Sequence, residues 1–387
     1  MSKKIEELFD LTLVSRRYPP QIGGAERVMQ NLAHGFAAQG LRVTVLSSEN
    51  RLEGVERTVD DRPADVAQNP KIVRLPYSGI RMAGTFFYLR ALERWFEKHR
   101  PSLVYVSMLK HDAFACVRYG MRRGVPIVLR PEGAGLTGDM EWQSQDRFGR
   151  VIVRTTRQAN AFVALSPRIH DELLEAGYSE QRIHDIPNGV PIPAHIWTPP
   201  KLGRGPTAAF VGRLAPEKGL DRLLRAWKLV HMELPEARLE IIGEGPSEES
   251  LRSLATASGI AHTVDFRGAR GDIAQCLANA DLFVLPSREE GLSMSLLEAM
   301  AAGIPVIVSD IPGNRTLVKQ GETGRIVDCE NTAEFAQAIL AGLRGDESTL
   351  RMAVDGRSLV SRRYSIEFMV GEHLNLFRRL NGERVKT

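Results

Sequence analysis

Residues 282–308 read LFVLPSREEGLSMSLLEAMAAGIPVIV, and this stretch predicts a strand, a helix and a second strand in turn. The first apolar run has strand length and ends at Pro286. A helix is expected from about Ser295 to Ala302, and the second apolar run, residues 306–308, follows a glycine and a proline. Because parallel strands need a crossover connection, usually a helix, the stretch predicts two neighbouring parallel strands of one sheet.

The same alternation of strands and helices runs along the chain on both sides of a proline-rich break. Five prolines fall within residues 190–206 and interrupt both periodicities. We therefore expect an N-terminal α/β domain over 1–190, a linker over 191–206 and a C-terminal α/β domain over 207–365. A closing helix over 366–387 could pack back across the boundary. Each domain should contain a doubly wound, Rossmann-like parallel sheet, with ligands in the cleft between the two.

Length and composition agree with two domains and exclude several other classes of protein. The 387 residues exceed one ordinary core, and 43% of them are apolar and 25% charged, as in globular proteins. No run of eighteen apolar residues or signal-peptide core occurs, and the three cysteines are far apart. We therefore expect a cytoplasmic protein, and the net charge of +4 does not suggest a nucleic-acid partner.

The motifs that are missing narrow the chemistry. The sequence contains no Gly-x-x-x-x-Gly-Lys-[Ser/Thr], no His-Glu-x-x-His, no Gly-x-Ser-x-Gly and no Asp-x-Asp. Residues 243–248 imitate a dinucleotide fingerprint but lack its third glycine, so a tight strand-to-helix turn explains them better. No metal ion and no resident cofactor are therefore expected.

Two glutamates of the quoted stretch have the chemistry that a nucleotide sugar requires. Glu290 follows the strand, where its carboxylate can orient sugar hydroxyls or stabilise positive charge at the anomeric carbon. Glu298 lies about one turn inside the helix and can accept from both hydroxyls of a ribose; alternatively, it is simply an acidic residue near a helix start. The amides that open this helix and can hold phosphate oxygens are those of Gly291, Leu292, Ser293 and Met294.

Cations and glycines elsewhere suit the diphosphate of the same ligand. Arg213 and Lys218 flank the loop after the first strand of the second domain, where they can neutralise a diphosphate leaving group without a metal. The ordinary alternative is two surface cations, one of them paired with Glu217. Gly23 and Gly24 directly precede a helix whose amides can face an anion, although a plain turn would look the same.

Taken together, these features resemble the retaining glycosyltransferases of family 4, which have the GT-B fold, over essentially the whole chain. Singly each matching string is weak, but their order and spacing argue against chance. The matching strings are YPP at 18–20, GGAERV at 23–28, ALS at 164–166, IPNGV at 186–190, FVGRL at 210–214, PEKG at 216–219, GEGP at 243–246, PS at 286–287 and, within 290–306, EG, LLEAMAAG and PV.

The resemblance implies a role for each matched residue of the second domain. Arg213 and Lys218 match the pair that binds the donor diphosphate. Glu298 matches the ribose ligand, and Glu290 matches the group that holds the transferred sugar. The two glutamates fit the family's Glu-x7-Glu pattern.

Two further matches concern the phosphates and the base of the donor. Gly23 and Gly24 match the first-domain loop that closes on the phosphates. Arg267 and Gly268 lie in the turn whose backbone usually reads the base in this family.

The chain also departs from the family pattern in two places. Many members have His-Gly where this sequence has Glu132 and Gly133, which puts a histidine-assisted step in doubt. Glu132 or Arg130 could orient the sugar or recognise the acceptor, and a buried structural ion pair between them is the alternative. Pro191 replaces the acidic residue that usually ends the string at 188–191.

The acceptor side gives weaker signals. A helix over residues 84–99 is expected to carry Phe86, Leu89, Leu92 and Phe96 on one face and cations elsewhere. With the other arginines of the first half, this helix could dock to an anionic membrane surface. An ordinary helix that covers the first sheet is the alternative.

From the residues and the resemblance we expect a metal-independent, retaining glycosyltransferase at the inner face of the membrane or free in the cytoplasm. Its partners would be a nucleotide-sugar donor and a glycan or lipid-linked acceptor. A nucleotide-sugar epimerase and a non-catalytic nucleotide-sugar-binding protein are the alternatives. Domain closure would exclude the water that could otherwise hydrolyse the donor.

Overall fold

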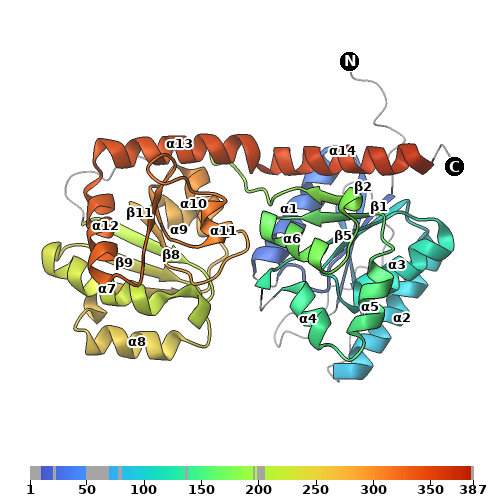
Figure 1. Cartoon of the computed structure of the whole chain (residues 1–387), viewed down its shortest axis with the longest axis horizontal. Coiled ribbons are helices and arrows are strands. Elements are labelled where there is room, and N and C mark those ends of the chain that lie inside the picture. The colour runs from blue at the N-terminus through green and yellow to red at the C-terminus, as the bar shows by residue number, and fades with distance from the viewer. Residues whose placement is uncertain are drawn as a thin grey trace, which may run out of the picture. The chain divides into compact units, whose positions relative to one another are not determined.

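The computed structural model describes residues 10–20, 23–48, 69–76, 81–135, 138–194, 197 and 205–384. The chain divides into two compact units, Met1–Pro187 with Ile366–Thr387, and Asn188–Ser365. Each unit contains one parallel sheet with helices on both of its faces (Figure 1). Within the described ranges, no helix is both long enough and apolar enough to cross a membrane.

The first unit contains a seven-stranded sheet in the order β3-β2-β1-β4-β5-β6-β7. Every residue of the three strands β4, β5 and β6 is buried, as expected for parallel strands that helices cover on both sides. The strands are β1 (Asp10–Val14), β2 (Arg42–Ser48), β3 (Lys71–Leu75), β4 (Leu103–Ser107), β5 (Ile127–Arg130), β6 (Ala161–Ala164) and β7 (Ile183–Asp185).

The helices of this unit follow the strands in chain order, and the last helix of the chain joins them. They are α1 (Gly24–Ala38), α2 (Arg81–His99), α3 (His111–Arg123), α4 (Asp139–Gln145), α5 (Gly149–Thr156), α6 (Pro167–Glu175) and α14 (Ile366–Arg384). Phe377 on α14 packs against Phe36 on α1, with ring centroids 5.3 Å apart. Helix α14 therefore belongs to the core of the first unit.

The second unit contains a six-stranded sheet in the order β10-β9-β8-β11-β12-β13. The strands are β8 (Thr207–Val211), β9 (Arg238–Ile242), β10 (Val264–Gly268), β11 (Leu282–Leu285), β12 (Val306–Ser309) and β13 (Arg325–Val327). The helices are α7 (Leu220–Glu233), α8 (Glu248–Ala257), α9 (Ile273–Ala278), α10 (Met294–Ala302), α11 (Pro312–Arg315), α12 (Thr332–Arg344) and α13 (Glu347–Arg363). Helices α7, α8 and α12 pack together, and so do α9, α10 and α13. In Figure 1 these two groups cover opposite faces of the sheet.

Both sheets have a point where the strand order reverses, and this point decides where a ligand can bind. Chain order runs outward in both directions from β1 and β4 in the first unit, and from β8 and β11 in the second. The loops that leave the carboxyl ends of these two strands diverge to opposite faces and leave a crevice between them. The sequence predicted this doubly wound α/β class, and the structure confirms it.

Two local predictions need correction. Strand β3, at the edge of the first sheet, was not predicted from the sequence. The buried face of α2 carries Tyr88, Leu92 and Phe96, whereas Phe86 is 60% exposed. The burial of Leu92 and Phe96 confirms that part of the expected face, whereas its first member, Phe86, was wrong, because the aromatic residues at 86–88 lie on different sides of the helix.

Candidate active site

The candidate site lies at the switch point of the second sheet, where the loops after β8 and β11 meet. The loop after β8 forms a short 3-10 turn over Pro216–Lys218 before α7 begins. The loop after β11 contains residues 286–293 and ends at α10. The Lys218 ammonium donates to Glu290 Oε1 at 2.8 Å. This ion pair joins the two loops across the crevice in which α/β proteins bind their ligands.

A set of buried polar side chains fixes the Glu290 carboxylate. Only 8% of the Glu290 side chain is exposed, so its position depends on the groups around it. Ser287 is fully buried and donates from Oγ to Glu290 Oε1 at 2.7 Å. The Ser287 carbonyl in turn accepts a 2.5 Å hydrogen bond from Ser309 Oγ at the end of β12. Asn314 on α11 donates to the Ser309 carbonyl at 3.0 Å. The carboxylate therefore has a fixed orientation before any ligand arrives.

Close backbone approach holds the two loops together. Gly219 has a left-handed φ of 65°, and a Cβ atom there would collide with the Pro286 carbonyl oxygen. The backbone N–H of Arg288 donates to the Glu217 carbonyl at 2.7 Å. The Arg288 guanidinium binds both carboxylate oxygens of Asp221, at 2.8 and 3.0 Å. These hydrogen bonds hold the pKa of Asp221 below its ordinary value.

The turn at 243–246 supports the same loop from the side of β9. The Leu214 N–H donates to the Glu244 carbonyl at 3.0 Å, and the Ser247 N–H donates to the Leu214 carbonyl at 2.9 Å. A Cβ atom on Gly243 would collide with the Gly212 carbonyl oxygen. The glycines of this turn therefore allow two backbone segments to approach closely, as the tight-turn interpretation predicts.

The remaining predicted residues of this unit lie on or beside the same loops. Arg213 is exposed, and its side chain has no ion-pair partner among the described residues. Ser293 caps α10 by accepting from the Leu296 N–H at 3.4 Å, so the helix begins one residue earlier than expected. Glu298 lies half-buried in the second turn of α10.

The turn at 267–269 has its own partners. Arg267 pairs with Glu240 at 2.7 Å and with Asp265 at 3.1 Å, and the bond to Glu240 raises the pKa of Arg267. The Gly268 carbonyl accepts from the Gly243 N–H at 2.9 Å. The Arg267 side chain is thus held on the surface, and base recognition by this turn stays a prediction.

In the first unit, the structure places Glu132 in a buried ion pair. Glu132 Oε1 accepts from the Arg130 guanidinium and, at 2.6 Å, from Ser107 Oγ. Burial raises the pKa of Glu132, and the positive charge of Arg130 opposes the shift. The 8% exposure of its side chain leaves little of it accessible. These contacts fit the structural alternative, and a part for Glu132 in the reaction stays a prediction.

The predicted phosphate loop at Gly23 and Gly24 is the start of α1. Here the Glu26 side chain folds back toward Gly23, and Arg17 lies 3.9 Å from its carboxylate. A phosphate at this helix start would have to displace Glu26, because like charges repel at short distance. Binding of the donor phosphates by the loop at Gly23 and Gly24 stays a prediction.

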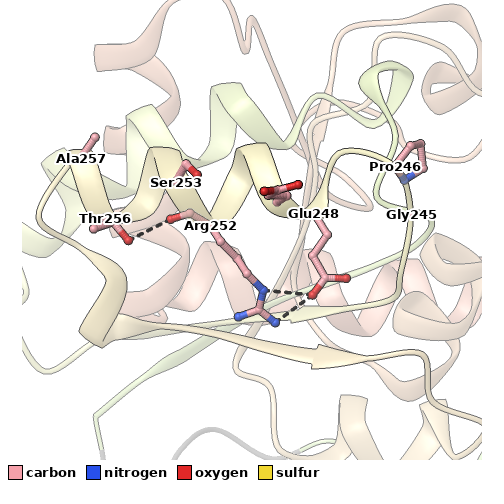
Figure 2. A pocket seen from close by; sticks show the side chains of 8 residues that line it. Gly245, Pro246, Glu248, Arg252, Ser253, Thr256 and Ala257 are labelled. Atoms are coloured by element: carbon pink, nitrogen blue, oxygen red, sulfur yellow. Dashed lines mark hydrogen bonds and ion pairs between the residues drawn. The ribbon is translucent and has the colours of Figure 1, made fainter.

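A shallow hollow of about 830 Å³ lies along α8 and is bounded at one end by Gly245 and Pro246 of the turn at 243–246 (Figure 2). Its lining includes Arg252, Ser253 and Thr256, and the Arg252 guanidinium already binds Glu248 at 2.8 and 3.0 Å. The residues that line this hollow include none of the predicted site residues. The hollow on α8 is therefore not the candidate site.

The sequence analysis gave no role to Ser287, Ser309 or Asn314. A usable signal exists for the two serines, because each is a polar residue at the carboxyl end of an apolar strand. Such residues line the ligand crevice of a parallel sheet. Asn314 has no comparable signal, since its contact depends on how α11 folds back over the loop.

Two Rossmann-like units, with a cation and a carboxylate paired at the switch point of the second, are the architecture of a GT-B glycosyltransferase. Residues 22–192 match the family described as "Glycosyltransferase Family 4", and residues 193–358 match "Glycosyl transferases group 1". Together the two matches span nearly the whole chain, which therefore belongs to the family 4, group 1 glycosyltransferases. The protein is an enzyme of the glycosyl-transfer class.

Individual relatives agree with this assignment. An uncharacterized glycosyltransferase of Haemophilus influenzae is 28% identical over 90% of this chain and 95% of its own length. The GDP-mannose-dependent phosphatidylinositol monomannoside mannosyltransferase of Mycobacterium tuberculosis is 35% identical, over 42% of this chain and 45% of its own length. Among solved structures, Anabaena HepE in complex with UDP and glucose has a TM-score of 0.77 at 19% identity, covering 96% of this chain and 99% of that one. The structural likeness shows the GT-B fold.

Proposed function

We propose that this enzyme is a retaining glycosyltransferase that moves a sugar from a nucleoside diphosphate to a hydroxyl group without a metal ion. The acceptor in this proposal is a glycan or a lipid-linked saccharide. The observation that carries the proposal is the Lys218–Glu290 ion pair at the switch point of the second sheet. It places a cation suited to phosphate beside a carboxylate suited to sugar hydroxyls.

The leaving group in this proposal is stabilised by fixed positive charge. A departing nucleoside diphosphate develops negative charge on its terminal phosphate. Lys218 and Arg213 extend from the same loop, and the exposed Arg213 side chain is accessible to a ligand. Preorganised charges of this kind can stabilise the transition state by several kcal/mol, at about 3 kcal/mol for each well-placed donor.

The two glutamates would bind the two sugars of the donor, Glu290 the transferred sugar and Glu298 the ribose. Glu290 would accept from sugar hydroxyls, and Ser287 would keep its carboxylate in the orientation that this contact needs. Glu298, in the second turn of α10, would accept from the ribose hydroxyls. The amides at the start of α10 would face phosphate oxygens.

Retention requires that the acceptor oxygen arrives on the face from which the phosphate leaves. The bond between the anomeric carbon and the phosphate oxygen breaks, and the acceptor oxygen forms a bond to the same face of that carbon. The acceptor proton passes to the departing phosphate oxygen, which can serve as its own base. The products are a glycoside and a nucleoside diphosphate, and neither a histidine nor Glu132 is needed for the proton.

The relatives support a nucleotide-sugar donor without defining its base. HepE was solved in complex with UDP and glucose. The mycobacterial mannosyltransferase is named for its dependence on GDP-mannose. Both uridine and guanosine donors therefore belong in the test.

The test is a thermal-shift screen of the full-length protein against nucleoside diphosphates and their sugars, run once with EDTA and once without it. Lys218→Gln and Glu298→Ala should each weaken binding of the best nucleotide by about tenfold or more, because each removes a charge-assisted contact. Lys319→Gln is the matched control, because Lys319 is an exposed lysine of the same unit. Product anomers, assigned by NMR, then report retention.

The outcomes separate the parts of the proposal. Nucleotide stabilisation that survives both substitutions would refute the site assignment. Stabilisation or transfer that disappears in EDTA would refute metal independence. An inverted anomer would refute the front-face mechanism.

A further inference from the structure

The first unit has a pocket of its own at its switch point. Its volume is about 720 Å³, and its walls are the loops after β1 and β4, one side of α2 and the connection between α4 and α5. Arg16, after β1, pairs with Asp112, after β4, at 2.5 Å. The pocket therefore occupies the position in the first sheet that Lys218 and Glu290 occupy in the second.

The charged groups that line this pocket leave an excess of positive charge. Of its three carboxylates, Asp112 pairs with the Arg16 guanidinium, Glu26 lies 3.9 Å from Arg17, and Asp146 lies 3.9 Å from His111. Two further cations, Lys110 and Arg147, also line the pocket. Within the described residues, neither forms an ion pair with a carboxylate. Burial lowers the pKa of His111, so this side chain adds no charge near neutral pH and does not neutralise Asp146. The four cations of the lining, Arg16, Arg17, Lys110 and Arg147, therefore exceed its three carboxylates by one.

Both of these cations lie over aromatic rings at the mouth of the pocket. The Lys110 ammonium is 5.3 Å from the Trp142 ring centroid, and the Arg147 guanidinium is 5.2 Å from that of Phe148. Phe148 is 46% exposed and Trp142 is half-buried. Aromatic surface beside a few polar groups is typical of sites that bind compact organic ligands. A pyranose ring has both an apolar C–H face and hydroxyl groups, which match these two kinds of surface.

The backbone beside this pocket is held in an unusual conformation. Met108 has a left-handed φ of 69°, which is uncommon for a residue other than glycine. Its N–H donates to the Arg130 carbonyl at 2.8 Å. Lys110 lines the pocket from the end of the loop that contains this strained residue, and His111 and Asp112 line it from the first turn of α3.

We propose that this pocket binds the acceptor, and that the acceptor is a saccharide with an anionic group, phosphate or carboxylate, which Lys110 and Arg147 contact. The inference rests on the proposed function, since it names the substrate class of the same reaction. Trp142 is the surface on which the sugar ring packs. The Arg16–Asp112 ion pair joins the loop after β1 to the start of α3, and both side chains line the pocket, where their polar atoms can contact the sugar hydroxyls.

The experiment measures binding of small probes to the full-length protein by saturation-transfer NMR titration at low salt. The probes are glucose 1-phosphate, glucuronate, glucose and inorganic phosphate. The variants are Lys110→Gln, Arg147→Gln and Trp142→Ala. Arg118→Gln is the matched control, because Arg118 is an exposed arginine of the same unit that lies 5.6 Å from the Phe114 ring centroid, outside the pocket.

The wild-type protein should bind glucose 1-phosphate or glucuronate about tenfold more tightly than glucose, because the two cations form charge-assisted contacts. Lys110→Gln and Arg147→Gln should reduce this preference below about threefold, whereas Arg118→Gln should leave it unchanged. Trp142→Ala should weaken all three saccharides. A preference for either anionic sugar supports the proposal and identifies the anion.

Three results would overturn the proposal that this pocket binds an anionic acceptor. The first is equal binding of glucose and both anionic sugars. The second is inorganic phosphate binding as tightly as glucose 1-phosphate, which would indicate a simple anion site. The third is loss of the nucleotide thermal shift in Lys110→Gln or Arg147→Gln, which would assign the pocket to the donor. The nucleotide screen on Lys218→Gln does not depend on any of these three results. If the saccharide titration fails, the proposed function is therefore still intact.

Discussion

At the scale of single residues, Gly219 decides whether the two loops of the donor site can meet. Its φ of 65° is one that side chains disfavour, and the Pro286 carbonyl oxygen occupies the space of a Cβ atom. Gly219→Ala should therefore lower the free energy of unfolding by about 2–4 kcal/mol, from conformational strain and from displacement of the β11 loop. Urea unfolding checks the value.

Gly259 is the matched control for this substitution. It has a similar φ of 75°, but a Cβ atom there meets nothing within 4 Å. Gly259→Ala should lower the free energy of unfolding by only about 1 kcal/mol. Equal costs for the two substitutions would mean that the approach of Pro286 does not constrain the site.

Ser287 is predicted to act through Glu290. Ser287→Ala removes the 2.7 Å hydrogen bond that orients the carboxylate and leaves its contact with Lys218 in place. We expect kcat to fall about tenfold with little change in the KM for the donor. This is the result of losing an interaction that stabilises the transition state but not the bound substrate. Ser287→Thr, which keeps a hydroxyl, should recover part of the loss. The exposed Ser250→Ala is the control. A rise in KM at constant kcat would show instead that Ser287 serves ground-state binding.

At the scale of elements, α14 is tied to the first sheet by a buried histidine. His373 Nδ1 lies 2.8 Å from the Met369 carbonyl, so this nitrogen must donate, and Nε2 accepts from the Tyr105 hydroxyl at 2.8 Å. The contact with Tyr105 requires an unprotonated Nε2 and therefore the neutral ring, whereas Nδ1 can donate in either protonation state. Burial lowers the pKa of His373 to about 3, and nearby Arg130 opposes protonation further. The helix is therefore held by a group that cannot accept a proton without loss of packing.

This histidine predicts how stability depends on pH. Between about pH 6.5 and pH 3 the unfolded chain binds a proton at His373 that the folded chain does not, so stability falls as pH falls through this window. The contribution at pH 5 should be about 2 kcal/mol smaller than at pH 7.5. His373→Gln should therefore destabilise the protein more at pH 7.5 than at pH 5, as measured by urea unfolding. The exposed His99→Gln is the control substitution. If His373→Gln lowers the free energy of unfolding equally at both pH values, the assignment of a neutral, buried His373 is wrong.

The elements themselves were largely predictable where periodicity is strong. The pattern over residues 282–308 predicted the boundaries of β11, α10 and β12 to within about one residue, because two apolar strands flank a helix that Ser293 caps. The orientation of α2 was not predictable, because Phe86, Phe87 and Tyr88 offer three adjacent aromatic faces. Only contact with α3 and the sheet decides that Tyr88 is buried and Phe86 is exposed.

At the scale of the whole molecule, the two units repeat one arrangement. In each, a basic residue after the first central strand pairs with an acidic residue after the second: Arg16 with Asp112 in the first turn of α3, and Lys218 with Glu290 in the loop after β11. Sequence analysis identified Lys218 and Glu290 separately from their loops and from the family resemblance. It could not identify the pairing, because 72 residues separate these two partners and 96 separate Arg16 from Asp112. Only the order of the strands in each sheet brings such residues together.

The most direct test of the account is a crystal structure of the enzyme with the nucleoside diphosphate that the thermal-shift screen selects. The account predicts a terminal phosphate within hydrogen-bonding distance of Lys218 Nζ, the ribose on Glu298 and no metal ion between phosphate and protein. A nucleotide bound along α8, or in the pocket that Lys110 and Trp142 line, would contradict it.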